Sequence, residues 1–307
     1  MLFTYNRFYY NSNIMNIYDC FMYFDEDLLL DLRLNILDKY VKKFIITEST
    51  YLHSGKKKKL NFDINNFQKF KDKIIYIVVD KLPNGIEEIY SSDDTAIKNR
   101  KILDNSLKRE NNQRVQLIKG LTEAHGDDVI FSSDLDEIPN LKNFKIKKKI
   151  TLFEQDVFYY KFNLIQPNFK WVGTRACKKK NLLGFQWLRN IKSKVYPHWR
   201  IDTLFSKKRY MNVDIIKNGG WHFTSIKKPK EIFYKLSNFM HHLEFEESGL
   251  TLKDMENMVK QKKILYDHTV AQEDKKYTGN LSLRKTSNEL LPDYIKKNLE
   301  RYKEWLD

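Results

Sequence analysis

Four short apolar segments in the first 140 residues constrain the fold more than any other feature of the chain. Each is rich in β-branched and aromatic residues and runs into polar or acidic residues; they cover residues 17–24, 44–46, 73–80 and 129–131. Helical spacing of apolar residues over 28–40 and 99–124 separates them. Strands that alternate with helices in this way predict an α/β fold with a mostly parallel sheet covered by helices on both faces.

An Asp-x-Asp pattern, Asp134-Leu135-Asp136, follows the last of these strands. Side chains alternate in extended backbone, so both carboxylates are expected on one side, where they could hold a divalent cation and the phosphates it carries. Parallel sheets bind ligands at the carboxyl ends of strands, and Glu48 and Asp80 also fall at such ends. The spacing is common, so a solvated turn is the alternative, but the strand end favours a site.

The second half of the chain is predicted to be β-rich at first and then helical. Residues 151–165 are aromatic and β-branched, and helical spacing of apolar residues recurs over 232–242, 254–268 and 292–306. We expect residues 15–250 to form one domain. Residues 251–307 are expected to form a helical extension packed on this domain. Residues 1–14 are expected to form a disordered N-terminal extension.

A histidine follows two glycines in Gly219-Gly220-Trp221-His222-Phe223. Paired glycines permit a close backbone approach or a positive φ, so the side chain of His222 is expected in a defined place. A lone histidine is more often a core residue than a ligand. Here the two interpretations carry equal weight.

The composition limits the partners. The formal net charge is +15, and lysines cluster at residues 56–59, 147–149, 178–180 and 227–230. Such a surface favours polyanions, including phosphorylated ligands and anionic membranes. The clusters lack the interleaved aromatic residues of a groove that binds single-stranded nucleic acid, so no nucleic-acid partner is expected.

The cellular location of the protein is predicted from three features that the sequence lacks. The two cysteines, Cys20 and Cys177, have no metal-ligand spacing and fit a reducing compartment. No apolar run approaches the length of a membrane span, and the N-terminus has no signal-peptide core. We therefore expect a cytoplasmic protein, soluble or peripherally associated with a membrane through its basic surface.

Six motifs in order resemble glycosyltransferase family 17, which includes β-1,4-N-acetylglucosaminyltransferases. They are Asp19-Cys20-Phe21 with the helix pattern from Glu26 to Arg33-Leu34, Lys43 to Ser49, His53-Ser54-Gly55-Lys56, Arg109-Glu110-x-x-Gln113-Arg114, Ser133 to Pro139, and Gly220-Trp221-His222-Phe223. The resemblance implies a GT-A-like fold, a UDP-sugar donor carrying GlcNAc, a divalent cation (Mn²⁺ or Mg²⁺) and inversion at the anomeric carbon. It implies as acceptor a glycan, a glycoprotein or a lipid-linked sugar.

The resemblance also assigns roles to the acidic pattern and its neighbours. Asp134 and Asp136 would bind the metal and the donor, with Asp136 in direct metal contact and Asp134 serving the nucleotide. His222 would complete the metal or diphosphate site. An inverting transfer also needs a base, and Glu137 and Glu244 are both candidates.

Three further residues are expected at the donor. Arg109 and Arg114, on the helix before the acids, would face the negatively charged diphosphate, and Glu48 would lie by the nucleoside.

Two other functions use the same residues. A metal-dependent nuclease or nucleotidyltransferase would place the acids on a metal and the lysines on nucleic acid. A non-catalytic basic protein that binds carbohydrate or lipid would need none of the acids. The ordered set of motifs favours the transferase over both.

Overall fold

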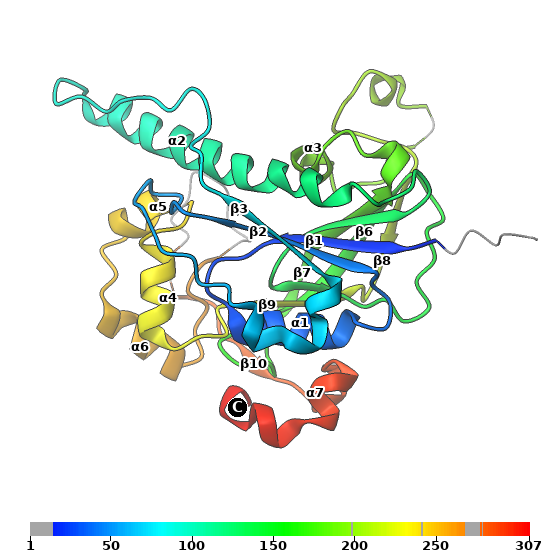
Figure 1. Cartoon of the computed structure of the whole chain (residues 1–307). Helices are drawn as coiled ribbons and strands as arrows, with labels where there is room; N and C mark the ends of the chain where they lie inside the picture. Colours follow the sequence, from blue (N-terminus) through cyan, green and yellow to red (C-terminus); the bar gives the residue numbers. More distant parts are fainter. Residues whose placement is uncertain (1–14, 198, 241, 268–276, 278) are drawn as a thin grey trace, which may run out of the picture.

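The computed structural model describes residues 15–197, 199–240, 242–267, 277 and 279–307. Within these residues a 10-stranded sheet forms the centre of the protein (Figure 1). Its first half is parallel, in the order β3-β2-β1-β4, as the sequence predicts. The bounds of these strands are Ile17–Met22 for β1, Lys43–Ser49 for β2, Ile74–Val79 for β3 and Val129–Asp134 for β4.

The second half of the sheet is mixed. β7 pairs antiparallel with both β4 and β6, while β8 and β9 run parallel to β6 and β5 closes the sheet antiparallel to β9. A short strand β10 pairs with the start of β7. The bounds are Glu137–Pro139 for β5, Ile150–Tyr159 for β6, Leu164–Lys178 for β7, Val213–Ile216 for β8, Gly220–Thr224 for β9 and Arg284–Lys285 for β10.

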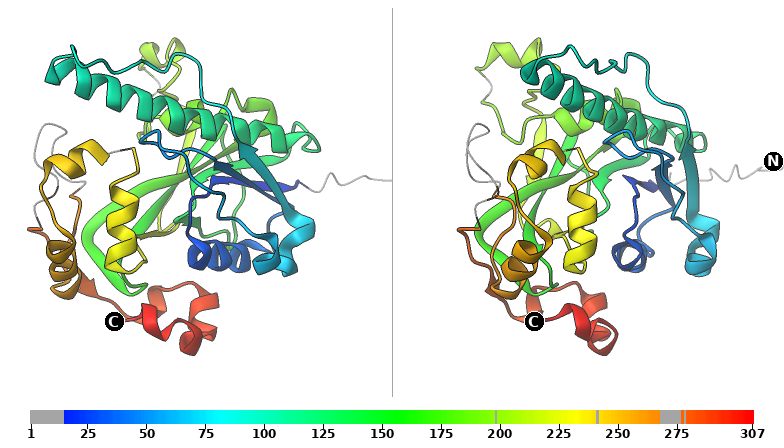
Figure 2. Two further views of the ribbon diagram at one scale, coloured as in Figure 1. Left: turned by 60° about the vertical axis from the view of Figure 1, so that its left-hand side comes forward. Right: turned by 90° about the vertical axis from the view of Figure 1, so that its left-hand side faces the viewer.

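Both faces of β1, β2 and β4 are buried, which explains their uninterrupted apolar runs. Phe44 and Ile46 of β2 pack with the leucines of α1 (Asp27–Leu37) on one face. Ile45, between them, packs on the other face with Leu117 and Leu121 of the 3₁₀ helix η2 (Gln116–Leu121). Both views of Figure 2 show α1 on one side of the sheet and α2, which leads into η2, on the other.

The helix before the acids differs from the prediction of one apolar-faced helix over residues 99–124. α2 spans Thr95–Val115 and is followed by η2. Its buried residues are polar (Asn105, Ser106, Gln113 and Arg114), while its apolar side chains at 103, 107 and 115 are exposed. The expected stripe was wrong because α2 turns its polar side toward the carboxyl ends of the strands, and η2 supplies the core contacts instead.

The remaining helices are shorter than the sequence predicts. Residues 232–242 were expected in one helix, but α4 (Pro229–Leu236) and α5 (His242–Glu247) lie on either side of a break. α6 spans Leu252–Lys260, and the last residue of the helix expected over 254–268 lies outside the described residues. At the C-terminus α7 (Asp293–Lys297) and the 3₁₀ helix η6 (Leu299–Trp305) replace one continuous helix.

The C-terminal helices are part of the main core, since Ile295 and Tyr302 pack with α1 and the sheet. Five more short segments complete the described elements. They are α3 (Phe185–Asn190) and the 3₁₀ helices η1 (Ile64–Lys73), η3 (Lys179–Asn181), η4 (Ile201–Leu204) and η5 (Asn288–Leu290). Among the described residues, no helix combines the length and the apolar character needed to cross a membrane.

Candidate active site

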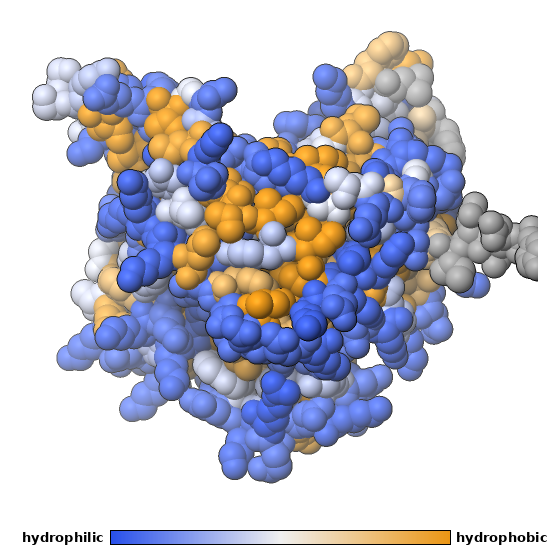
Figure 3. Space-filling view, in the orientation of Figure 1, coloured by the Kyte–Doolittle hydropathy of each residue, from blue (hydrophilic) through white to orange (hydrophobic). Residues whose placement is uncertain are grey.

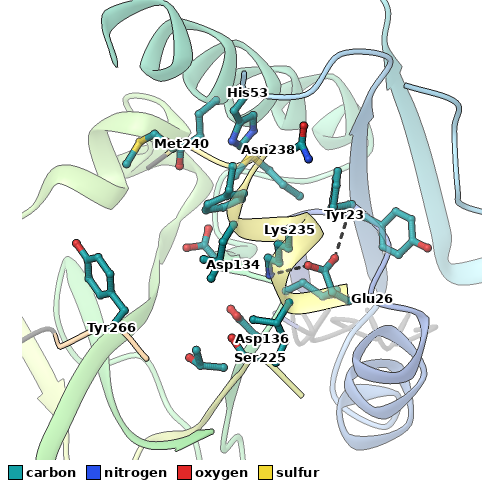
Figure 4. A pocket seen from close by; sticks show the side chains of 18 of the residues that line it. Tyr23, Glu26, His53, Asp134, Asp136, Ser225, Lys235, Asn238, Met240 and Tyr266 are labelled. Atoms are coloured by element: carbon teal, nitrogen blue, oxygen red, sulfur yellow. Dashed lines mark hydrogen bonds and ion pairs between the residues drawn. The ribbon is translucent and has the colours of Figure 1, made fainter. Parts of the chain in front are cut away.

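A cavity of about 360 Å³ opens at the carboxyl ends of β1 and β4. Asp134, Asp136 and Glu137 line it together with His222, and α4 contributes Lys235 to the wall. Figure 4 shows Asp134 and Asp136 between Tyr266 on one side of the cavity and Glu26 and Lys235 on the other. The volume lies within the range of small-molecule sites, and the position is the one expected for a ligand of a parallel sheet.

Asp134 and Asp136 do not share one strand. β4 ends at Asp134, Leu135 and Asp136 form a turn, and the chain continues as β5, paired with β9. The alternation predicted for a single extended strand was therefore wrong. The turn itself brings both side chains to the cavity.

Asp134 is held by two arginines. Arg189 of α3 donates from Nη2 to Oδ2 at 2.8 Å, and Arg114 of α2 donates from Nη2 to Oδ1 at 3.2 Å. Burial alone would raise the pKa of Asp134, but the two guanidinium groups outweigh it and hold that pKa well below its usual range. Asp134 is thus a fixed, already neutralised carboxylate at the edge of the cavity.

Asp136 is fixed through its backbone and faces His222. Its carbonyl oxygen accepts from the N–H of Phe223 at 2.9 Å. Its Oδ1 lies 3.6 Å from His222 Nε2, which also contacts Thr224 Oγ1 at 3.0 Å. Burial lowers the pKa of His222, but the Asp136 carboxylate outweighs burial and raises it. The structure thus brings together Asp136 and His222, residues far apart in the sequence.

The glycines before His222 make this contact possible. Gly220 has a φ of +140°, a conformation that L side chains rarely adopt, and a Cβ there would lie 2.2 Å from the carbonyl oxygen of Ile138. The close approach lets β9 pair with β5, with His222 opposite Glu137. Gly220 thereby sets the register that places His222 beside the Asp136 turn.

Glu137 is buried and fully engaged. Its carboxylate accepts from Trp171 Nε1 at 2.7 Å, from Arg189 Nη1 at 2.6 Å and from the backbone N–H of Asp134 at 2.8 Å. A Cβ at Gly173 would lie 2.7 Å from its Cδ, so the neighbouring strand leaves room for this carboxylate only because residue 173 is glycine. Glu137 anchors the turn, Trp171 and Arg189 together.

Arg33 of α1 supports the same turn from below. Its Nε and Nη2 donate to the two carboxylate oxygens of Asp19 at 2.8 and 2.7 Å. Its Nη1 donates to the carbonyl oxygens of residues 134, 135 and 137 at 3.2, 3.1 and 2.8 Å. Arg33 and Asp19 are both fully buried. One buried cation thus fixes the backbone that carries both acids of the Asp-x-Asp pattern.

The opposite wall carries a partly buried ion pair, Lys235 and Glu26, 2.8 Å apart. Lys227 lies next to it and pairs with Asp25 at 2.6 Å. Burial raises the pKa of Glu26, but Lys235 and Lys227 outweigh it and lower that pKa to about 2. Glu26 is therefore ionised, and Lys235 brings a positive charge to the wall that faces Asp136.

Four predicted site residues do not line the cavity: Glu48, Arg109, Arg114 and Glu244. Glu48 is buried at the end of β2, where its carboxylate accepts from Lys58 Nζ, from the N–H groups of residues 61 and 62 and from Tyr76. Arg109 donates to the carbonyl oxygen of His53 at 3.0 Å. Glu244 lies in α5, outside the lining. Glu48 therefore holds a loop on β3, and the prediction that it lies by a nucleoside finds no support in this geometry.

Arg114 is also set back from the cavity, behind Asp134. Besides Asp134 it pairs with Glu110 at 2.7 Å and donates to Gln186 at 2.7 Å. Arg114 contributes to the site by holding Asp134. The sequence analysis instead expected it to face the diphosphate of the donor.

The sequence analysis did not find Arg189 or Lys235. Nothing near them in the chain signals a site, because α3 and α4 lie beside the acids only in the folded protein. Glu26 and Arg33 did carry a signal, because both belong to the helix pattern shared with the family.

Among the described residues, no three histidine, cysteine, aspartate or glutamate side chains are grouped so that they could hold a metal ion. Asp136 and His222 nevertheless fit a smaller set. The carboxylate suits Mn²⁺ or Mg²⁺, either of which completes its coordination with phosphate and water, and the imidazole favours Mn²⁺ over the harder Mg²⁺. His222 turns its Nε2 toward Asp136 Oδ1, 3.6 Å away, so a cation shared by the two residues would be held through that nitrogen.

Comparison with known families decides the identity. The sequence model named Glycosyltransferase family 17 matches residues 5–306, nearly the whole chain. The chain belongs to glycosyltransferase family 17. This membership confirms the resemblance drawn from the six motifs and makes the protein a glycosyltransferase, with a sugar donor and a glycan acceptor as its partners.

Other comparisons add little to the family assignment. No curated protein matches this glycosyltransferase. A solved structure titled "Crystal Structure of a Mycobacterial Protein" matches with 10% sequence identity and a TM-score of 0.31, over 90% of this chain and 85% of that chain. A TM-score this low carries no argument about fold or function.

Proposed function

We propose that this glycosyltransferase moves a sugar, GlcNAc by analogy with the family, from a UDP donor to a hydroxyl of a glycan with inversion at the anomeric carbon. The observation that carries the proposal is the Asp134–Asp136 turn, fixed by Arg33 and open to a cavity at the strand ends. A parallel half-sheet followed by a mixed half, with the acids at their junction, supports a GT-A-like arrangement.

The diphosphate is proposed to lie between Asp136 and Lys235. A divalent cation held by Asp136 and His222 supplies charge neutralisation for the departing UDP when it is bound. Lys235 adds a fixed positive charge from the other wall, already ordered by Glu26. Asp134, neutralised by Arg189 and Arg114, is left to accept hydrogen bonds from the nucleotide without adding net negative charge.

Aromatic rings are proposed to hold the sugars. Trp171 lines the cavity, lies 5.6 Å from the His222 ring and is oriented by its hydrogen bond to Glu137. Tyr266 and Tyr277 line the cavity too, with ring centroids 5.1 Å apart. The apolar C–H faces of a sugar ring pack well on such surfaces. In this proposal Glu137 acts as the anchor of Trp171, since its oxygens are shared among three donors.

Asp136→Asn tests the proposal. We expect wild-type protein with Mn²⁺ to release UDP from one member of a panel of UDP- and GDP-sugars. Asp136→Asn should lose that release without a change in melting temperature, because Asp136 contributes no buried ion pair to the fold other than its 3.6 Å contact with His222 among the described residues. Asp127→Asn is the matched control, since Asp127 is an exposed aspartate paired with Lys178.

Near-normal turnover of Asp136→Asn would overturn the proposed role of Asp136. Steeply salt-dependent binding of DNA or RNA, with no UDP release from any donor, would instead support the nuclease alternative.

A further inference from the structure

Residues 192–197 and 199–208 lie in an excursion that leaves the body of the protein (Figure 1). The backbone N–H of Lys192 donates to the carbonyl oxygen of Lys208 at 2.8 Å, which closes the two ends together. The excursion follows directly on α3, and Figure 1 shows this yellow-green segment projecting away from the sheet. A segment tied at its neck and projecting from the fold is well placed to contact another surface.

The excursion and the turn before α3 carry the most exposed large apolar side chains among the described residues. Phe205 is 86% exposed, Trp199 75%, Leu183 70% and Ile201 68%. Apolar side chains gather at the end of this projection in Figure 3. Because exposed apolar groups this close together are costly in water, such a cluster marks an interaction site.

The same segment is strongly basic. Residues 191–210 contain six lysines or arginines and one acidic residue, Asp202. Asp202 is already paired with Arg200 at 2.6 Å and with Arg209 at 2.9 Å. The four lysines are exposed, and no carboxylate of the described chain pairs with them; they are Lys192, Lys194, Lys207 and Lys208. Apolar side chains are thus flanked by uncompensated positive charge.

A second group of lysines adjoins the neck of the excursion. Lys149 Nζ lies 5.6 Å from the centre of the Tyr210 ring, and the backbone N–H of Lys149 donates to Asn212 at 3.2 Å. Lys147, Lys148 and Lys178 line the same shallow surface as Lys149. The positive surface therefore extends from the excursion onto the body of the protein.

We propose that this excursion docks the protein on an anionic phospholipid bilayer. Trp199, Ile201 and Phe205 enter the headgroup region, and the lysines bind the lipid phosphates. A bilayer fits better than nucleic acid for two reasons: the surface projects instead of forming a groove, and Leu183 and Ile201 have no ring on which bases stack. The proposal does not depend on the transferase reaction.

Vesicle co-sedimentation of the full chain tests the proposal. We expect binding to vesicles of phosphatidylcholine with phosphatidylglycerol, weakening as salt is added, and little binding to phosphatidylcholine alone. Lys207→Gln with Lys208→Gln should lower the partition coefficient about thirtyfold, at about tenfold per 1.4 kcal/mol and about 1 kcal/mol per lysine near the surface. Trp199→Ser with Phe205→Ser should abolish binding without lowering the melting temperature.

Two matched control variants test whether binding depends on the excursion and not on exposed apolar side chains or lysines elsewhere. Ile89→Ser with Tyr90→Ser removes exposed apolar side chains elsewhere, and Lys56→Gln with Lys57→Gln removes two exposed lysines elsewhere. Both should bind vesicles like the wild type. The proposal is overturned if the wild type ignores anionic vesicles, if either control loses as much binding as the excursion variants, or if the excursion binds an RNA oligonucleotide in place of vesicles.

Discussion

Replacing Arg33 by methionine should destabilise the protein strongly and should also weaken transfer. Arg33 lies beneath the turn that carries Asp134 and Asp136, and its own side chain does not line the cavity. The substitution removes a buried cation from Asp19 and a donor from three backbone carbonyl groups. Methionine keeps most of the side-chain volume, so the change tests charge and hydrogen bonding more than packing.

The expected loss is about 3–5 kcal/mol of unfolding free energy, because Arg33→Met leaves the Asp19 carboxylate buried without its counter-charge. That is a large share of the roughly 5–15 kcal/mol that stabilises a typical domain. Replacing both partners, with Asp19→Leu added, leaves no unpaired charge and should restore most of the stability. The double variant still lacks the donor to the turn, so its transfer activity should stay low.

Urea unfolding of the two single variants and the double variant completes a double-mutant cycle, and UDP release is measured on each folded variant. Arg100→Met is the control, since Arg100 is an exposed arginine paired with Glu87, and its unfolding midpoint should not shift measurably. The reasoning fails if Arg33→Met costs less than about 1 kcal/mol, well below the buried-pair range. It also fails if the double variant regains full activity together with its stability.

Two further predictions concern the rest of the site and the core. Lys235→Met should destabilise the protein at neutral pH. The difference in unfolding free energy from the wild type should shrink as pH falls from about 4.3, the unfolded pKa of a glutamate, toward about 2, the pKa of Glu26 in the folded protein. Urea unfolding across this pH range measures the difference, and a pH-independent value would contradict the prediction. Gly120→Ala should cost about 1–3 kcal/mol, because its Cβ would lie 2.5 Å from Ile45 Cγ2; an unchanged melting temperature would show that Ile45 moves freely.

The sequence predicted the parallel half of the sheet well because apolar strands covered on both faces have few alternatives. Phe44, Ile45 and Ile46 must all be buried, so they need helices on each side. α2 was interpreted less well. Its apolar residues suggested a face toward the core, but Gln113 and Arg114 are buried instead, because they bond Thr47 and Asp134 at the strand ends. Hydrogen bonds to the strand ends, and not apolar packing, decide which side of α2 is buried.

The candidate site, too, was predicted only in part. The sequence indicates where each strand ends, but it does not indicate the direction in which each side chain points. Glu48 lies at a strand end and points to Tyr76, away from the cavity. Asp134 and Asp136 do line the cavity, although through a turn and not through strand alternation. Arg189 comes from a helix 52 residues beyond Glu137, so only the folded chain reveals their contact.

The charges of the cavity suggest why Asp136 is the carboxylate that would take a cation. In the proposed function a diphosphate would enter a cavity that Glu26, Asp134, Glu137 and Asp136 line. Glu26 is neutralised by Lys235, and Asp134 and Glu137 share Arg189. Asp136 differs from the other three carboxylates. Its basic neighbour is a histidine, and no lysine or arginine of the described structure lies within ion-pair distance of it. A cation that arrives with the diphosphate would therefore bind at Asp136, while the other three carboxylates would stay paired with their basic partners.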